Sequence, residues 1–291
     1  MGRKITVAVA QTGPVLSEDM HPAADVACGM IEEAHRQGVE IICFPEVFLT
    51  PFFPAQLRSD CEHFFMELPN PITDSFLDLA REKNVAVIFG FGERAGGHFY
   101  NSAAIFDRGG CHLGTYRKAH LPAILPTNLK GGTGSYEKMY FSPGGELPVY
   151  EMDGVRFGIQ ICYERKFPEA SRALALQGAE IIFMPICAAT YGETKLRDNT
   201  WALPLQCRAY ENGVFVVAAN RCGDENGRSH IGQSMIVNPV GAEIMAQGGR
   251  DEPVLLVETL DLDDVSAAQK SLPWWRDRRP DLYATLSDAR I

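Results

Sequence analysis

The order of the apolar runs constrains the fold of this chain more than any other sequence feature. At first, strand-like runs at 5–10 and 39–44 alternate with helix-like segments over about 23–37 and 73–83. The runs at 85–92, 100–106 and 113–118 then follow one another with only short, partly Gly-rich turns between them, which predicts antiparallel hairpins. A chain that mixes both styles is expected to form mixed α/β sheets, not a purely alternating parallel plan.

The second half of the chain repeats this mixture. Helices are predicted at 168–177 and over about 195–211, and Pro204 is expected to kink the second of them. We find no linker, charge block or short-period repeat, so the whole chain 1–291 is interpreted as a single domain, and 46% hydrophobic residues suffice for its core. Further strands are predicted at 155–162, 180–184, 214–219, 233–238, 243–246 and 254–260.

Charge and composition exclude several classes of partner and site. The formal net charge of -10 is expected to repel phosphate backbones and anionic membrane surfaces, which argues against nucleic acid as a partner. No apolar stretch is long enough to span a bilayer, and the opening MGRKITVAVAQTG is typical of a first strand, not of a signal peptide. Eight scattered cysteines without an export signal indicate a reduced, cytoplasmic protein. The sequence contains no CxxC pair and no His/Cys cluster at ligand spacing, which argues against a zinc site.

Three reactive groups stand at the ends of strand-like runs: Glu46 after 41–45, Lys118 after 113–117 and Cys162 after 157–161. Strand ends at one sheet edge converge, and α/β folds build their sites there. A lone free cysteine is most often a small buried hydrophobe, and a lone glutamate or lysine at such a place is usually solvated. Together, however, the three supply the nucleophile, base and oxyanion-binding cation that attack on a carbon–nitrogen bond needs. A competing serine elbow of the G-x-S-x-G type is absent from the sequence.

Three segments carry a resemblance to a known family. FPEVFLT (44–50), YRKAHLP (116–122) and ICYERKFPE (161–169) resemble, in this order, the signature blocks of the nitrilase superfamily of carbon–nitrogen hydrolases. The resemblance extends to VAVAQ, SYEKMYFSPGG, LQGAEIIFMP, RAYENGVFVVAAN and IVNPVGAEI, and so covers nearly the whole chain. It implies a four-layer α-β-β-α sandwich with mixed sheets, assembled as a homodimer or a larger homo-oligomer.

The resemblance also implies roles for individual residues. Glu46 is expected to be the general base, Lys118 the cation that stabilises the oxyanion, and Cys162 the nucleophile, while Glu137 matches a second glutamate that orients the lysine. Cys162 would lie at a strand-to-helix corner, where the N-terminal end of a helix favours thiolate and oxyanion. The backbone N–H of Tyr163 is the candidate second oxyanion donor. The chemistry requires neither a metal nor an organic cofactor.

Finer similarities favour a substrate class. The segments EKMYF with Pro143-Gly144, and TPFFP at 50–54, are similar to D-amino-acid carbamoylases, which hydrolyse N-carbamoyl amino acids to the amine, carbon dioxide and ammonia. Those enzymes grip the substrate carboxylate with two adjacent arginines, which here are Arg165 and Lys166; the lysine keeps the charge but loses the planar fork. The histidine that follows their lysine is retained as His120.

Departures from that subfamily leave the substrate open. Ser135 replaces a histidine two residues before the second glutamate, and Cys187-Ala188 replaces a polar Asn-Thr pair. Carbamoyl-β-alanine, carbamoylputrescine and a plain amide therefore remain candidates. An anionic substrate suits the two cations after the nucleophile, whereas a cationic one needs acidic walls, for which the sequence offers Glu164 or Glu193.

Two alternative functions are considered. An aliphatic amidase, ω-amidase or true nitrilase would use the same triad, and its products would separate it from a carbamoylase. A catalytically inactive scaffold or binding protein would have no chemical reason to retain the full catalytic set. The C-terminal segment from about 263, which contains Trp274 and Trp275, is predicted to be an arm that packs on its own or a neighbouring subunit.

Overall fold

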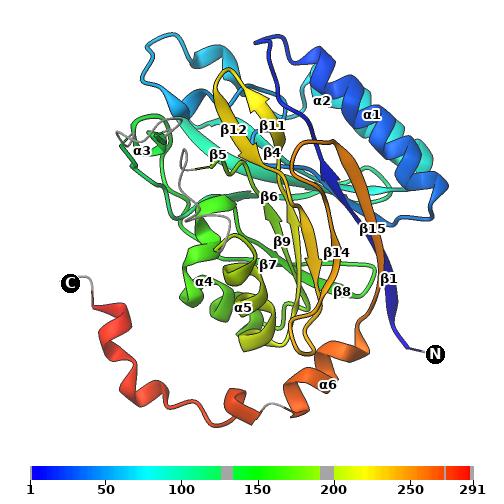
Figure 1. Ribbon diagram of the computed structural model, residues 1–291, viewed down its shortest axis with the longest axis vertical. Helices are drawn as coiled ribbons and strands as arrows, with labels where there is room; N and C mark the ends of the chain where they lie inside the picture. Colours follow the sequence, from blue (N-terminus) through cyan, green and yellow to red (C-terminus); the bar gives the residue numbers. More distant parts are fainter. Residues whose placement is uncertain (1, 126–133, 191–199, 272, 289–291) are drawn as a thin grey trace.

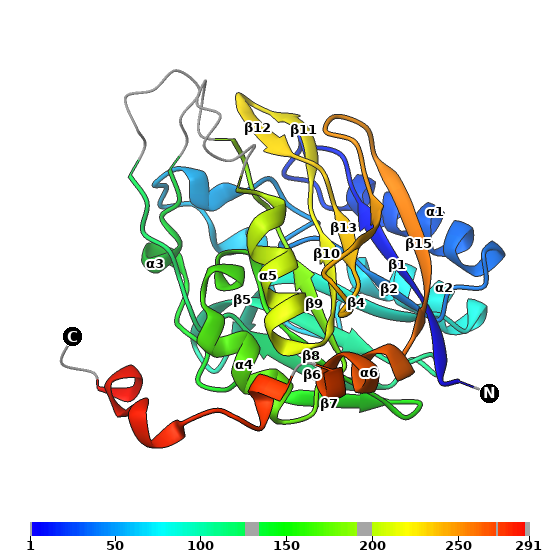
Figure 2. The ribbon, with the colours of Figure 1, turned by 60° about the horizontal axis from the view of Figure 1, so that its bottom comes forward.

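Two β-sheets pack face to face, and helices cover the outer face of each (Figures 1 and 2). The computed structural model describes residues 2–125, 134–190, 200–271 and 273–288. The predicted four-layer α-β-β-α sandwich is confirmed.

The first sheet has the strand order β15-β1-β2-β4-β5-β6, with β3 beside β4. Strands β1, β2 and β4 run parallel, while β4, β5 and β6 form the antiparallel series that the Gly-rich turns predict. The bounds are β1 Lys4–Gln11, β2 Ile41–Cys43, β3 Phe65–Met66, β4 Ala86–Ala95, β5 His98–Phe106, β6 His112–Arg117 and β15 Val254–Asp261.

The second sheet has the order β14-β13-β10-β9-β8-β7, in which β8, β9 and β10 run parallel. A separate two-stranded hairpin of β11 and β12 lies between β10 and β13 in the sequence. The bounds are β7 Val149–Met152, β8 Val155–Ile159, β9 Ile181–Pro185, β10 Phe215–Ala219, β11 Cys222–Glu225, β12 Arg228–Ile231, β13 Met235–Val237 and β14 Ile244–Gln247.

The helices form two outer layers. Helices α1 (His21–Arg36) and α2 (Pro71–Lys83) cover the first sheet, and α4 (Pro168–Leu176) and α5 (Ala202–Asn212) cover the second. Helix α1 buries a stripe of small apolar side chains at helical spacing, namely Ala24, Ala27, Ile31 and Ala34. Two further helices are short: α3 (Glu137–Tyr140) and α6 (Asp263–Ser271).

The central core lies between the two sheets. Along β1, Ile5, Val7 and Val9 point into this core, while Ala8 and Ala10 point to the helices α1 and α2. Parallel strands such as β9 are buried on both faces, which is why 181–185 is a continuous apolar run without alternation. The strand ends near Glu46, Lys118 and Cys162 are therefore fixed by a well-packed frame.

The predicted kink at Pro204 is wrong. Helix α5 begins at Ala202, so Pro204 lies in its first turn. Backbone N–H groups in the first turn have no intrahelical acceptor, so a proline there costs no hydrogen bond. The predicted start near 195 lies outside the described residues.

The C-terminal segment packs on its own chain only in its first part. Val265 and Ala268 of α6 are buried, and Trp274 Nε1 donates to the Glu211 carbonyl at 3.2 Å. From about 276 onward the segment extends away from the sandwich in both views (Figures 1 and 2). Among the described residues, no helix has the length and apolar character to cross a membrane.

Candidate active site

Glu46 follows β2 and is brought under β4 by a close backbone contact. A Cβ at Gly90 would lie only 2.6 Å from the Glu46 Cα, so this approach requires a glycine in β4. The next residue, Val47, has a φ of 41°, which turns the chain sharply after the glutamate. The carboxylate is directed into the protein and is fully buried.

Lys118 directly follows β6 and is held from two sides by backbone hydrogen bonds. Its N–H donates to the Asn101 carbonyl at 2.9 Å, and its own carbonyl accepts from the Gly144 N–H at 2.9 Å. A Cβ at Gly144 would lie 2.1 Å from the Arg117 carbonyl oxygen, so Gly144 permits this contact.

Cys162 lies in a short turn between a strand and a helix, at the predicted corner. Strand β8 ends at Ile159, and Cys162 opens a 3₁₀ turn, Cys162–Lys166, with a φ of 49°. Helix α4 then begins at Pro168, where the sequence predicts it. The left-handed backbone conformation of Cys162 at this tight turn presents its side chain to the cavity. Nucleophiles of other enzymes lie at similarly strained turns.

The three predicted polar groups form one buried network. Lys118 Nζ lies 2.7 Å from Glu46 Oε1 and 2.6 Å from Glu137 Oε2. Asn101 Nδ2 donates to the same two oxygens, at 2.7 and 3.2 Å. The backbone N–H of Cys187 donates to Glu46 Oε2 at 3.0 Å. The lysine is therefore fixed between two carboxylates that cannot move independently.

The two carboxylates are not equivalent electrostatically. Burial acts to raise the pKa of Glu46, but the charge of Lys118 and hydrogen bonds from Lys118, Cys162 and Asn101 outweigh it and lower the pKa below its ordinary value. For Glu137, burial and the charge of Glu46 outweigh Lys118 and raise the pKa to about 6. At neutral pH Glu46 is ionised beside the thiol, which is the state a general base needs.

The thiol of Cys162 is protonated at rest. Burial, together with the charge of Glu46, raises its pKa to about 11, against the opposing charges of Lys118 and Arg165. Helix α4 begins at Pro168, as predicted, but burial and the charge of Glu46 oppose the expected stabilisation of the thiolate in the resting site. The predicted role of Cys162 as a nucleophile therefore needs a base to accept the thiol proton, and Glu46 is placed to do so.

A small cavity of about 50 Å³ opens at Cys162, and cations predominate among its charged side chains. Arg165, Lys166 and Arg228 all line it, together with Glu137 as its one lining carboxylate among the described residues. Arg165 Nη1 also donates to the Cys162 carbonyl at 2.7 Å and lies 3.9 Å from its sulfur. The other lining residues are Phe52, Pro122, Ile124, Ser135, Cys162, Tyr163, Cys187 and Ala188.

The other predicted substrate-binding residues fall in different places. Tyr163 lines the cavity next to the nucleophile. His120 is not among the lining residues; its Nδ1 lies 3.1 Å from Glu164 Oε1 and its ring stacks on Phe167 at 4.1 Å. Their roles, like those of Arg165 and Lys166, stay predictions.

One predicted acidic wall is corrected. Glu164 is completely buried and accepts hydrogen bonds from internal donors, so it does not face the cavity. The other acidic candidate, Glu193, lies outside the described residues. Ser135, which replaces an expected histidine, still supplies a donor, because its Oγ lies 3.2 Å from Glu137 Oε1.

Sequence reasoning missed Asn101 and Arg228. Asn101 lies within β5 in an unremarkable strand run, and only the register of β5 between β4 and β6 brings it to both carboxylates. Arg228 opens β12, 66 residues after the nucleophile in sequence, and packs over the Phe52 ring at 4.2 Å. A polar residue in the middle of a buried strand is the signal that identifies Asn101.

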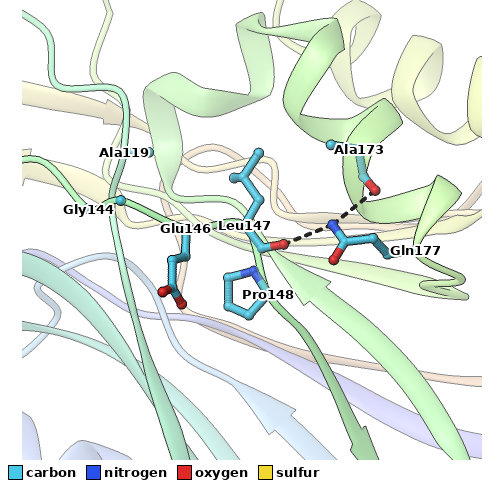
Figure 3. A pocket seen from close by; sticks show the side chains of 8 residues that line it. Ala119, Gly144, Glu146, Leu147, Pro148, Ala173 and Gln177 are labelled. Atoms are coloured by element: carbon cyan, nitrogen blue, oxygen red, sulfur yellow. Dashed lines mark hydrogen bonds between the residues drawn. The ribbon is translucent and has the colours of Figure 1, made fainter.

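A larger hollow of about 620 Å³ lies elsewhere and lacks the catalytic groups (Figure 3). Leu147 and Pro148 are among its lining residues, and Gln177 Nε2 donates to the Leu147 and Ala173 carbonyls. The described residues that line it include no cysteine or lysine, so the small cavity at Cys162 remains the candidate active site.

Comparison with known proteins agrees with this geometry. The family model for carbon-nitrogen hydrolase matches residues 6–270. An N-carbamoylputrescine amidase of Solanum tuberosum is 35% identical, over 98% of this chain and 95% of its own length. A carbon-nitrogen hydrolase from Helicobacter pylori superimposes with a TM-score of 0.90 at 27% identity, covering 99% of this chain and 100% of that one. An amidase variant of Nesterenkonia sp. AN1 (TM-score 0.77, 26% identity, 97% and 96% covered) carries the acetamide moiety of fluoroacetamide on its active-site cysteine.

Proposed function

Because the chain belongs to the carbon-nitrogen hydrolase family, we propose that it hydrolyses an N-carbamoyl amino acid, or a related N-carbamoyl amine, to the free amine, carbon dioxide and ammonia. One observation carries the proposal: Cys162 lines a cavity whose wall also includes Glu137, a carboxylate bound to Lys118. The reaction class is that of the family, and the substrate is the part proposed here.

The proposed reaction proceeds in two half-reactions. Glu46 accepts the thiol proton while Cys162 Sγ attacks the ureido carbon, and the electron pair of the C=O bond moves to oxygen. Lys118 Nζ and the Tyr163 N–H stabilise this oxyanion. The tetrahedral species collapses as ammonia leaves with the proton from Glu46, which leaves a thioester. Water then gives a proton to Glu46 and adds to the thioester carbon, the C–S bond breaks, and Cys162 Sγ takes the proton back from Glu46. The carbamic acid that is released separates into the amine and carbon dioxide.

The charge of the cavity supports an anionic substrate. Arg165, Lys166 and Arg228 approach it from two separate elements, the 3₁₀ turn and β12. A carboxylate placed among them gains charge-assisted hydrogen bonds, whereas an ammonium group meets like charges. The relative from Solanum tuberosum is named for carbamoylputrescine, which carries an amine. We nevertheless favour a carbamoyl acid for this chain because of these three cations.

Product analysis tests the proposal. Wild-type protein is offered N-carbamoyl-D-, L- and β-amino acids, carbamoylputrescine, simple amides and nitriles. We expect equal amounts of carbon dioxide and ammonia, with the highest kcat/KM for a carbamoyl acid. Replacing Arg228 by Met is expected to lower kcat/KM for the acid by about 10- to 100-fold, the range for a lost charged hydrogen bond. Ammonia with a carboxylic acid and no carbon dioxide would instead identify an amidase or nitrilase.

We also propose that the protein is a homodimer or larger homo-oligomer, in which residues 276–288 pack on a second copy. Leu282 and Leu286 are 64% and 68% exposed on this segment, which extends away from its own sandwich (Figure 2). Apolar side chains on an extended arm gain stability when a neighbour covers them. Removal of residues 276–291 is expected to lower the oligomer mass measured by light scattering. An unchanged mass would contradict the arm's role.

A further inference from the structure

Glu164 joins two segments that carry catalytic groups. It is completely buried, and its Oε2 accepts from the Ile161 N–H at 2.8 Å, one residue before the nucleophile. Its Oε1 accepts from the N–H groups of Ala119 at 3.1 Å and His120 at 3.3 Å, which directly follow Lys118. The carboxylate thus connects the chain after β6 to the turn after β8.

Two side chains complete the shell around this carboxylate. The Tyr116 hydroxyl lies 2.8 Å from both oxygens, and His120 Nδ1 lies 3.1 Å from Oε1. Burial and the charge of Glu164 raise the pKa of Tyr116, so its hydroxyl remains a donor. Among the described residues, each hydrogen-bond partner of this carboxylate is a donor or a His ring nitrogen able to donate, and an ionised carboxylate only accepts. A glutamine would present its NH₂ group to some of these donors.

The turn held by Glu164 contains the strained nucleophile. Cys162 has a φ of 49°, a conformation that non-glycine residues keep only where the surroundings impose it. The Glu164 N–H donates to the Ile161 carbonyl at 3.0 Å while its side chain accepts from the Ile161 N–H. These two bonds close the turn around Cys162 from backbone and side chain together.

We propose that Glu164 is a positioning residue that fixes the Cys162 thiol relative to the Lys118 ammonium group. It does not line the cavity, so it acts through the two segments it joins and not by contact with substrate. This inference rests on the proposed hydrolase function. A displacement of about 1 Å between reacting groups can reduce turnover about 100-fold without weakening substrate binding.

The test compares Glu164→Gln with Glu180→Gln. Glu180 is a matched control, since its side chain is only 12% exposed and accepts from a backbone N–H, that of Arg156, and from Arg3, and neither donor adjoins a residue of the catalytic network. We expect Glu164→Gln to lower kcat about 100-fold at nearly unchanged KM. Glu180→Gln is expected to lower the melting temperature and to keep kcat. Equal kcat losses in both variants, or wild-type kcat in Glu164→Gln, would overturn the inference.

Two further measurements keep the test decisive. If Glu164→Gln does not fold, Glu164→Asp replaces it. This variant keeps the carboxylate but shortens the side chain by one methylene, so kcat is expected to fall at unchanged KM. A wild-type kcat in Glu164→Asp would refute the role.

If wild type hydrolyses no compound in the panel, the proposed function fails, and the rate at which iodoacetamide alkylates Cys162 then tests the role of Glu164 alone. Slower alkylation in Glu164→Gln than in Glu180→Gln supports positioning, and equal rates oppose it.

Discussion

Replacing Cys162 by Ala is expected to lower kcat at least about 10⁴-fold, because no other group of the described cavity can take over covalent attack. Cys187 also lines the cavity, but it is 1% exposed and burial raises its pKa well above that of an ordinary thiol. The side chain of Cys162, by contrast, has Glu46 as a hydrogen-bond partner that can remove the thiol proton, whereas Cys187 contacts Glu46 through its backbone N–H. The assay is turnover of the best substrate of the panel.

Folding must be shown separately. Cys162→Ala removes one sulfur at a partly exposed corner, so the free energy of unfolding is expected to change by about 1 kcal/mol or less. Cys28→Ala on α1, another partly exposed cysteine, is a matched control that should keep wild-type kcat. Substantial turnover by folded Cys162→Ala is the result that would remove the thiol from the mechanism.

Replacing Lys118 by Met is expected to damage both activity and stability. Turnover should fall about 10²- to 10³-fold, since the cation facing the oxyanion is lost. The free energy of unfolding should fall by about 3–5 kcal/mol, because Glu46 and Glu137 then remain buried without their shared cation. Activity assays and chemical denaturation measure the two effects, and a variant with nearly wild-type turnover would contradict the role of Lys118.

The stability loss of Lys118→Met should depend on pH. Even with Lys118 present, burial and Glu46 raise the pKa of Glu137 to about 6, above the roughly 4.3 of an unfolded glutamate. Without the lysine the folded pKa rises further. A group whose pKa is higher in the folded state stabilises the fold below its unfolded pKa, and this stabilisation is lost as pH rises through its folded pKa. The variant should therefore be more stable relative to wild type at pH 5 than at pH 8. The double variant with Glu137→Gln should recover stability but not turnover.

Local pattern predicted the mixed α/β elements and the hairpins, while the family resemblance predicted the layers and the roles of the candidate catalytic groups. Apolar runs and Gly-rich turns specify β4, β5 and β6 without any tertiary information. Glu46, Lys118 and Cys162 each follow a recognisable run, and the family resemblance assigned their roles. The structure brings Glu46, Lys118 and Glu137 into one ion network and places Cys162 at its cavity.

What the sequence did not predict depends on register and on distant contacts. Asn101 reaches Glu46 and Glu137 only through strand pairing, and Arg228 reaches the cavity from a hairpin outside both main sheets. Glu164 was considered as a cavity wall, but the donors from the β6 segment turn it inward. Charge alone cannot separate a solvated carboxylate from a buried acceptor, since that depends on which N–H groups lie nearby.

The most direct test of the account is to map the covalent intermediate. The protein is quenched in acid during turnover of a carbamoyl acid labelled at the ureido carbon, and its peptides are analysed by mass spectrometry. We predict that the label is on Cys162 alone among the eight cysteines and is absent from the Cys162→Ala variant. Label on another cysteine, or sustained turnover by the folded variant, would contradict the account.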